Sequence, residues 1–135
     1  MIRNASSVLV AAVCTLSGCA VVAPYNQTPT ELKGDPAKFR ERVAFQMTFK
    51  EFLEAAYATQ TSCGDSVTFV VSPDKTSATA MLSIPGLSST ATVALAEAKS
   101  DTDGTSVNVW AQNNGWATAY LRALRQIGSP PRCHS

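Results

Sequence analysis

The chain has 135 residues, of which 45% are hydrophobic and 16% charged, and it contains four cysteines. This length suits one ordinary domain, and the composition excludes a disordered, collagen-like or coiled-coil chain. Eleven basic and ten acidic side chains give a net charge of +1, so the chain lacks the positive field that holds nucleic acid. We therefore expect no nucleic-acid partner.

The first twenty residues have the layout of an export signal. Arg3 supplies a positive charge, and an apolar run follows from Val8 to Leu16. Because a helix needs roughly 20 apolar residues to span the hydrocarbon core, this run is too short for a permanent membrane helix.

The apolar run ends in Leu16-Ser17-Gly18-Cys19, which resembles the lipobox of bacterial prolipoproteins. The resemblance implies that signal peptidase II cuts between Gly18 and Cys19. It also implies that Cys19 carries diacylglycerol on its thiol, the nucleophile suited to accept it, and an acyl chain on the new amino terminus. The alternative is an ordinary signal peptide cut elsewhere, which would leave Cys19 as a structural cysteine.

Two or more acyl chains hold a protein on a bilayer in effect permanently. In bacterial lipoproteins an Asp directly after the lipidated cysteine commonly causes retention in the inner membrane, and this chain has Ala20 there. The resemblance therefore implies an anchor in the inner leaflet of the outer membrane, with the domain facing the periplasm and the lipid bilayer as one partner.

The four cysteines then have different fates. Cys14 leaves with the signal peptide and Cys19 carries lipid, which leaves Cys63 and Cys133 in an oxidising compartment. We predict a Cys63–Cys133 disulfide, which would close a loop across a separation of 133 − 63 = 70 residues. The chain-entropy model gives such a loop roughly 4 kcal/mol of stabilisation. The competing interpretations are a metal site, which lacks further ligands, and a reactive thiol, which lacks a nearby base.

Residues 1–18 are thus predicted to be a signal peptide, and residues 19–41 a lipidated terminus followed by a flexible tether. The tether contains Pro24, Pro29 and Pro36 and shows no sustained helical or strand period. The periplasmic domain is predicted to occupy residues 42–135.

The domain is predicted to begin with a strand around Val43–Met47. Thr48 and Glu51 follow at the spacing of a capping box, and apolar residues at steps of three and four predict a helix to about Ser62.

Alternating apolar residues then predict four strands. The first two are Val67–Val71 and Ala78–Ile84, joined by a turn at Ser72–Lys75. The third has Val93 and Leu95 on one face and ends at Glu97. A polar loop at Lys99–Gly104 leads to the fourth, around Val107–Val109. The last element is a helix from Trp116 to Ile127, with Asn113 or Asn114 as its cap and Gly128 at its end.

The element order β-α-β-β-β-β-α predicts an α+β fold. We expect a two-layer sandwich, in which an antiparallel sheet of four to five strands carries both helices on one face. In element order alone, residues 42–133 are similar to small helix-grip modules of accessory outer-membrane lipoproteins. This similarity transfers no functional residue.

Catalytic and metal-binding patterns are missing from the sequence. The one histidine, His134, stands next to the last residue, and the chain has no nucleophile motif, metal-ligand spacing or glycine-rich phosphate loop. Glu51 belongs to the capping box, and Asp101 and Asp103 have the composition of a turn. We therefore expect no enzyme, no metal and no cofactor other than the lipid on Cys19.

The face of the sheet away from the helices offers a candidate binding surface. Val70, Met81 and Trp110 are predicted to point outward and could form an apolar patch for a protein partner. Alternatively, Trp110 covers a sheet edge or meets the tether. The sequence thus favours a non-catalytic interaction or assembly domain with an envelope protein partner. The alternative function is binding of a small apolar ligand between the C-terminal helix and the sheet.

Overall fold

The computed structural model describes residues 27–63, 67–85 and 90–129. Its elements in chain order are α2 (Pro29–Gly34), the 3-10 turn η2 (Pro36–Lys38), β1 (Phe39–Phe45), α3 (Phe49–Cys63), β2 (Val70–Val71), β3 (Ser77–Pro85), β4 (Thr90–Asp101), β5 (Gly104–Ala111) and α4 (Asn114–Arg125). From β1 onward, this order confirms the predicted sequence of strands and helices. None of the helices in the described ranges is long and apolar enough to cross a membrane.

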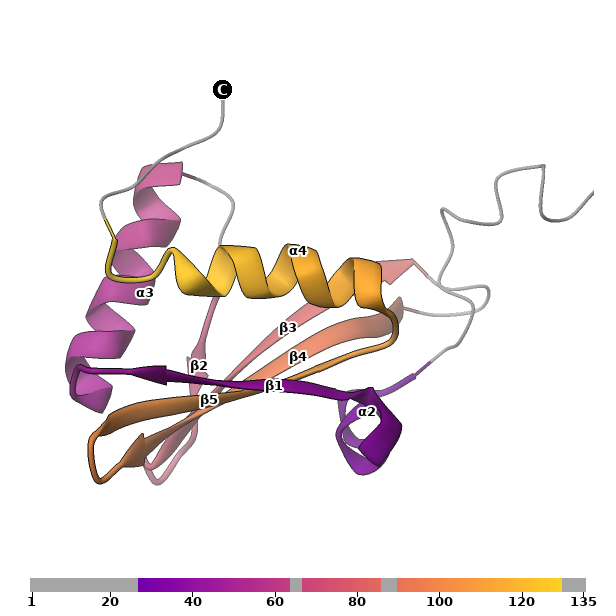
Figure 1. Ribbon diagram of the computed structural model, residues 1–135, viewed down its shortest axis with the longest axis horizontal. Helices are drawn as coiled ribbons and strands as arrows, with labels where there is room; N and C mark the ends of the chain where they lie inside the picture. The colour runs from indigo at the N-terminus through magenta and orange to yellow at the C-terminus, as the bar shows by residue number, and fades with distance from the viewer. Residues whose placement is uncertain (1–26, 64–66, 86–89, 130–135) are drawn as a thin grey trace, which may run out of the picture.

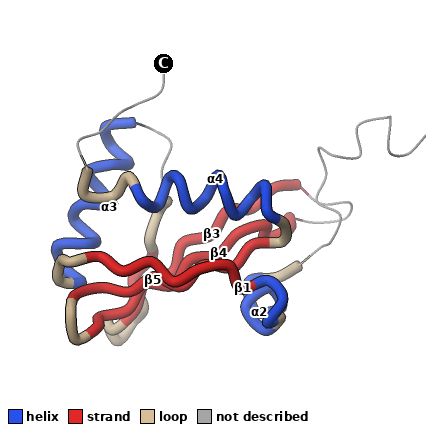
Figure 2. Tube along the Cα trace, viewed as in Figure 1, coloured by secondary structure: helices blue, strands red, loops and turns tan. Residues whose placement is uncertain are grey.

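The five strands form one antiparallel sheet in the order β1-β5-β4-β3-β2. Figure 1 shows α4 lying along one face of the sheet with α3 at one end, and α2 on the opposite side. Figure 2, coloured by secondary structure, shows the same helical layer above the strands. The predicted α+β sandwich with two helices on one face is therefore confirmed. We call the face under α3 and α4 the inner face and the opposite one the outer face.

The core between the helices and the inner face combines small residues on the sheet with large ones on the helices. Ala94, Ala96 and Ala98 of β4 are fully buried, and so are Phe52 of α3 and Leu124 of α4. Alanine side chains leave room for the helices to pack closely on the strands, and the larger helical side chains fill the space that remains.

Both main helices begin where the sequence predicts. The Thr48 backbone N–H donates to the Glu51 carboxylate at 2.9 Å, and the Glu51 N–H donates to the Thr48 hydroxyl at 3.2 Å, which completes the capping box of α3. The side-chain oxygen of Asn113 accepts the backbone N–H of Trp116 at 3.0 Å and caps α4. Gly128, with φ of +84°, follows the end of α4 as expected.

The prediction that Val93 and Leu95 share a face is wrong because β4 contains a bulge. Leu82 of β3 pairs with Ala94, but the next residue, Ser83, pairs with Thr92, so Val93 is an extra residue in the ladder. Val93 packs on the inner face near Trp116. Leu95 packs on the outer face instead.

The prediction that the third strand ends at Glu97 is also wrong, and so is the polar loop over Lys99–Gly104. The strand continues to Asp101, and the chain then turns tightly, so that Asp101 pairs with Gly104. Gly104 has φ of +143°, and a Cβ atom there would lie 2.3 Å from the carbonyl oxygen of Phe45. Glycine is therefore the residue that allows this hairpin to lie against β1.

The structure differs from the predicted tether over residues 29–41, which form α2, η2 and the start of β1. The Thr28 hydroxyl accepts the Glu31 N–H at 3.2 Å, and Pro29 stands in the first turn of α2. The Gln27 carbonyl accepts the Thr92 N–H at 2.9 Å. We call residues 27–38 the strap, because they run across the outer face as a part of the folded domain.

Candidate functional site

A row of apolar residues crosses the outer face of the sheet. In the strand register, Met81 pairs with Leu95, Leu95 with Trp110, and Trp110 with Phe39. Leu95 and Trp110 in the middle of the row are buried, whereas Met81 and Phe39 at its ends are exposed. The row therefore has a covered centre and open ends.

The strap covers the centre of this row. Leu32 of α2 has no exposed surface and packs with Leu95 and Trp110 in a cluster separate from the main core. The edge of the Phe39 ring meets Trp110 at a centroid distance of 5.8 Å, and the ammonium of Lys33 lies 5.8 Å from the centre of the Trp110 ring. Trp110 is thus enclosed by strap side chains on one side and by an aromatic neighbour on another.

An ion pair fastens the strap beside the apolar contact. The Lys33 ammonium pairs with one carboxylate oxygen of Glu97, and the Lys99 ammonium lies 3.1 Å from the other. Partial burial by itself would raise the pKa of Glu97, but hydrogen bonds from the two ammonium groups outweigh burial and hold this pKa below its ordinary value. Glu97 is therefore ionised and paired at neutral pH.

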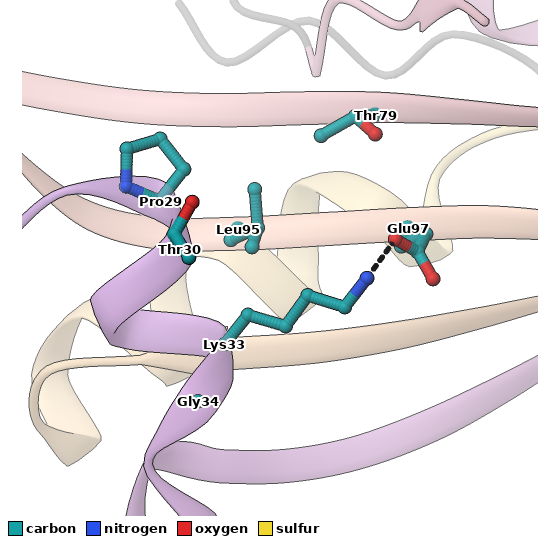
Figure 3. Close-up of a pocket in the computed structure, with 7 residues that line it drawn as sticks. All are labelled: Pro29, Thr30, Lys33, Gly34, Thr79, Leu95 and Glu97. Atoms are coloured by element: carbon teal, nitrogen blue, oxygen red, sulfur yellow. Dashed lines mark hydrogen bonds and ion pairs between the residues drawn. The ribbon is translucent and has the colours of Figure 1, made fainter.

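A depression of about 580 Å³ lies between α2 and the strands β3 and β4. Its lining residues are Pro29, Thr30, Lys33, Gly34, Thr79, Leu95 and Glu97. Figure 3 shows Lys33 reaching from α2 toward Glu97 along one side, with Leu95 and Thr79 on the strands. The depression opens to solvent, Leu95 provides apolar lining on β4, and the Lys33–Glu97 ion pair, which Lys99 also joins, lies along one side. A depression this open does not enclose a small ligand in the way that a buried cavity does.

The predicted patch needs one correction. Val70 is 68% exposed and Met81 is 53% exposed, but Trp110 is only 8% exposed because the strap covers it. The alternative interpretation, in which Trp110 meets the segment predicted to be the tether, matches the structure. Val70 pairs with Thr79, which lines the depression, so Val70 and Met81 both flank this site.

The cysteine predictions lie mainly outside the described residues. This applies to the motif Leu16-Ser17-Gly18-Cys19 and to Cys133. Cys63 is the last residue of α3, and its side chain is outside the described set. The lipidation of Cys19 and the Cys63–Cys133 disulfide therefore stay predictions, and His134 is likewise not among the described residues.

Two of the acidic residues considered for chemistry, Glu51 and Asp101, have local structural partners. Glu51 caps α3, and the N–H of Thr102 and the guanidinium of Arg42 donate to Asp101 at 2.7 and 2.8 Å. These bonds lower the pKa of Asp101, with the Thr102 backbone bond contributing most. Within the described ranges, no group of three His, Cys, Asp or Glu residues is placed to hold a metal ion.

Sequence reasoning missed Leu32, Lys33 and Glu97, which build the site. A signal for α2 was present in Thr28-Pro29-Thr30-Glu31, which combines a threonine cap, a proline in the first turn and a glutamate three residues after the cap. No comparable signal indicates that Glu97 faces Lys33, because their pairing depends on where the strap docks.

Comparisons of this chain with protein-family models, with curated proteins and with solved structures find no match.

Proposed function

We propose that this protein is an outer-membrane lipoprotein whose periplasmic domain is a non-catalytic interaction or assembly module. The observation that carries the proposal is the motif Leu16-Ser17-Gly18-Cys19 directly after the apolar run that begins at Val8. With a net charge of +1, the chain has little electrostatic attraction for an anionic surface, so the lipid on Cys19 provides the attachment.

Because the strap is folded onto the sheet, the connection between Cys19 and the folded domain is shorter than the predicted tether of residues 19–41. Gln27 already bonds to Thr92 of the sheet, so seven residues, 20–26, and therefore eight Cα–Cα steps, separate Cys19 from the folded domain. A fully extended chain of that length reaches at most about 28 Å. In the proposed protein the domain therefore stays close to the bilayer, with the strap end of the sheet on the anchored side.

The depression beside the strap is the proposed contact for an envelope protein. Met81 and Val70 provide exposed apolar surface on one flank, and Thr30 and Thr79 provide hydroxyl groups on the rim. Lys33 and Lys99 share the single carboxylate of Glu97, so this cluster keeps one positive charge, and recognition would depend on apolar burial and hydrogen bonds together with that charge.

Replacing the lipidated residue tests the anchor. Cys19→Ala should accumulate as an uncut precursor and be lost from the membrane fraction, measured by the mass of the purified chain and by cell fractionation. Cys14→Ala is the matched control, since it removes a thiol from the same signal segment and should be processed normally. Normal cleavage and membrane attachment of Cys19→Ala would contradict the proposal.

Site-specific crosslinking tests the contact surface. A photoreactive residue at Thr30, in the depression, should capture a reproducible envelope protein in intact cells. The same group at Tyr57, which is exposed on α3 far from the strap, serves as the control. Capture of no reproducible partner from Thr30, or the same products from both positions, would count against the depression as the contact site.

The alternative function, binding of a small apolar ligand, needs a cavity between α4 and the sheet. Side chains of the core occupy that interface: Phe52 and Leu124 are fully buried there, and Tyr120 is nearly so. The depression lies instead on the outer face, next to exposed side chains. The interaction module is therefore the function that the geometry supports better.

A further inference from the structure

The two edges of the sheet differ in how they are protected from other strands. The edge strand β1 carries Arg40, Glu41 and Arg42 in succession, and its register with β5 shifts between Phe39 and Glu41. Charged side chains and bulges are the usual devices that keep an edge strand from pairing with another chain. The β1 edge is therefore protected.

Among the residues that the structure describes, the opposite edge is open along most of β3. The short strand β2 pairs with β3 only at Ala78 and Thr79. In the described part of the chain, no strand pairs with the next six residues of β3, Ala80–Pro85, on the side of β2. Figure 1 shows β2 beside one end of β3 only. The open stretch carries no charged side chain.

The backbone of this stretch is oriented to accept a further strand. The Ser72 N–H donates to the Ser77 carbonyl at 2.8 Å, which shows that Ser77 directs its backbone groups toward β2. In an antiparallel ladder alternate residues share this direction, so Met81 and Ser83 present their N–H and C=O groups on the open side as well. A further strand would thus meet the N–H groups of Met81 and Ser83 and the carbonyls of Met81, Ser83 and Pro85, while Pro85 at the end of β3 has no N–H to donate.

Side chains along the open edge leave apolar surface on both faces. Met81 and Ser83 are exposed on the outer face. On the inner face Leu82 and Ile84 are only half-buried, although both pack against the small cluster at Ala91. A strand added here would cover apolar surface above and below the sheet.

We propose that a second copy of this chain pairs with Ala80–Pro85 in antiparallel orientation, so that two sheets join into one about a two-fold axis. Self-pairing brings the same residues of both copies together, and this uncharged stretch then sets no like charges opposite each other. At the β1 edge, self-pairing about Glu41 would place Arg40 opposite Arg42. Edge charge thus favours the β3 edge as the self-complementary one.

The interface is small, so the dimer is a reversible one. Two-fold pairing of this stretch provides about four backbone hydrogen bonds, because only Met81 and Ser83 offer N–H groups on the open side, together with contacts of Met81, Leu82 and Ile84. Interfaces at this end of the size range give concentration-dependent association. The proposal does not rest on the lipid anchor, because the edge lies within the folded domain.

Charge substitutions at Ser83 test the pairing. If the two-fold axis passes through Ser83, the two Ser83 side chains lie directly opposite each other. If it passes through Leu82, the two Ser83 side chains are diagonal neighbours across the strands. The full chain in mild detergent is examined by sedimentation over a range of concentrations. Ser83→Lys and Ser83→Glu should each raise the dimer Kd about tenfold, and mixing the two variants should restore the wild-type Kd. Tyr57→Lys, an exposed change on α3, should leave it unchanged.

Three results would each overturn the proposal: a wild-type chain that is monomeric at every concentration, a dimer that Ser83→Lys does not weaken, or a mixture of the Lys and Glu variants that stays as weak as either alone. Urea unfolding of each variant shows that loss of the dimer is not loss of the fold. Because processing at Cys19 and capture from Thr30 are measured separately, this outcome is independent of the proposed function.

Discussion

Truncation of Leu32 tests whether the strap is a docked part of the domain. Leu32 is completely buried against Leu95 and Trp110, and it is the one buried residue of α2. Leu32→Ala removes the apolar contact without changing either partner of the Lys33–Glu97 ion pair. We expect the strap to detach, because a six-residue helix has little stability of its own without tertiary packing.

The magnitude follows from the burial of the side chain. Replacing a fully buried leucine by alanine costs about 2.7–5.0 kcal/mol where the protein cannot relax around the cavity. The strap can open locally, so the cost to global stability cannot exceed the free energy with which the strap is docked. We therefore expect about 2–3 kcal/mol of lost docking free energy, and a smaller loss in the free energy of global unfolding.

Fluorescence of Trp110 reports the docking directly. With Trp116→Phe as the background, Trp110 is the only tryptophan in the chain. In this background Leu32→Ala should shift the emission to longer wavelength and make it several-fold more accessible to acrylamide. Urea unfolding, followed by circular dichroism, gives the loss in global stability separately.

Leu121→Ala is the matched control, because Leu121 is half-buried on α4 and packs against the main core. It should lower global stability without exposing Trp110. If Trp110 in Leu32→Ala stays as protected from acrylamide as in the parent, the Leu32 contact does not hold the strap on the sheet.

Three further outcomes are expected. The fold lowers the pKa of Glu97, so the ionised side chain stabilises the protein fully at pH values above its ordinary pKa of 4.5. This stabilisation is lost as the pH falls through the lowered pKa. Glu97→Gln should therefore flatten the acid dependence of the urea midpoint. Gly104→Ala should cost about 2–4 kcal/mol in urea unfolding because its Cβ would strike the Phe45 carbonyl, whereas Gly34→Ala, with open space around it, should be tolerated. The oxidised mature chain should be lighter than its reduced form by two hydrogens, and free thiols at Cys63 and Cys133 would exclude the predicted disulfide.

The parts of the fold that sequence reasoning predicted are those with strong local signals. In α3 the pair Thr48 and Glu51 fixes the first turn, and apolar residues at helical spacing supply the buried face. The final helix combines the Asn113 cap with Gly128 beyond its end. Since strands joined by short turns pair with their neighbours, the antiparallel sheet followed from the order of elements.

The strap was missed although its first turn carries the same kind of signal. Thr28 and Glu31 repeat the Thr-x-x-Glu spacing of Thr48 and Glu51. A helix of six residues with one buried side chain, Leu32, is too short to show an apolar period, so its prolines instead suggested an extended tether. The bulge at Val93 was missed because alternation counts residues and cannot reveal one that the ladder skips.

The depression could not be predicted for a different reason: its two walls lie far apart in the sequence. The alternation of apolar residues correctly placed Trp110 on the outer face. Leu32, which covers Trp110, lies in the short helix α2, and strand alternation says nothing about where that helix docks. Once the strap is docked, the segment next to the proposed anchor also forms one wall of the proposed binding site. Anchoring and recognition are then coupled in one element, because a change that releases the strap lengthens the connection to Cys19 and removes the wall at Thr30 and Lys33 together.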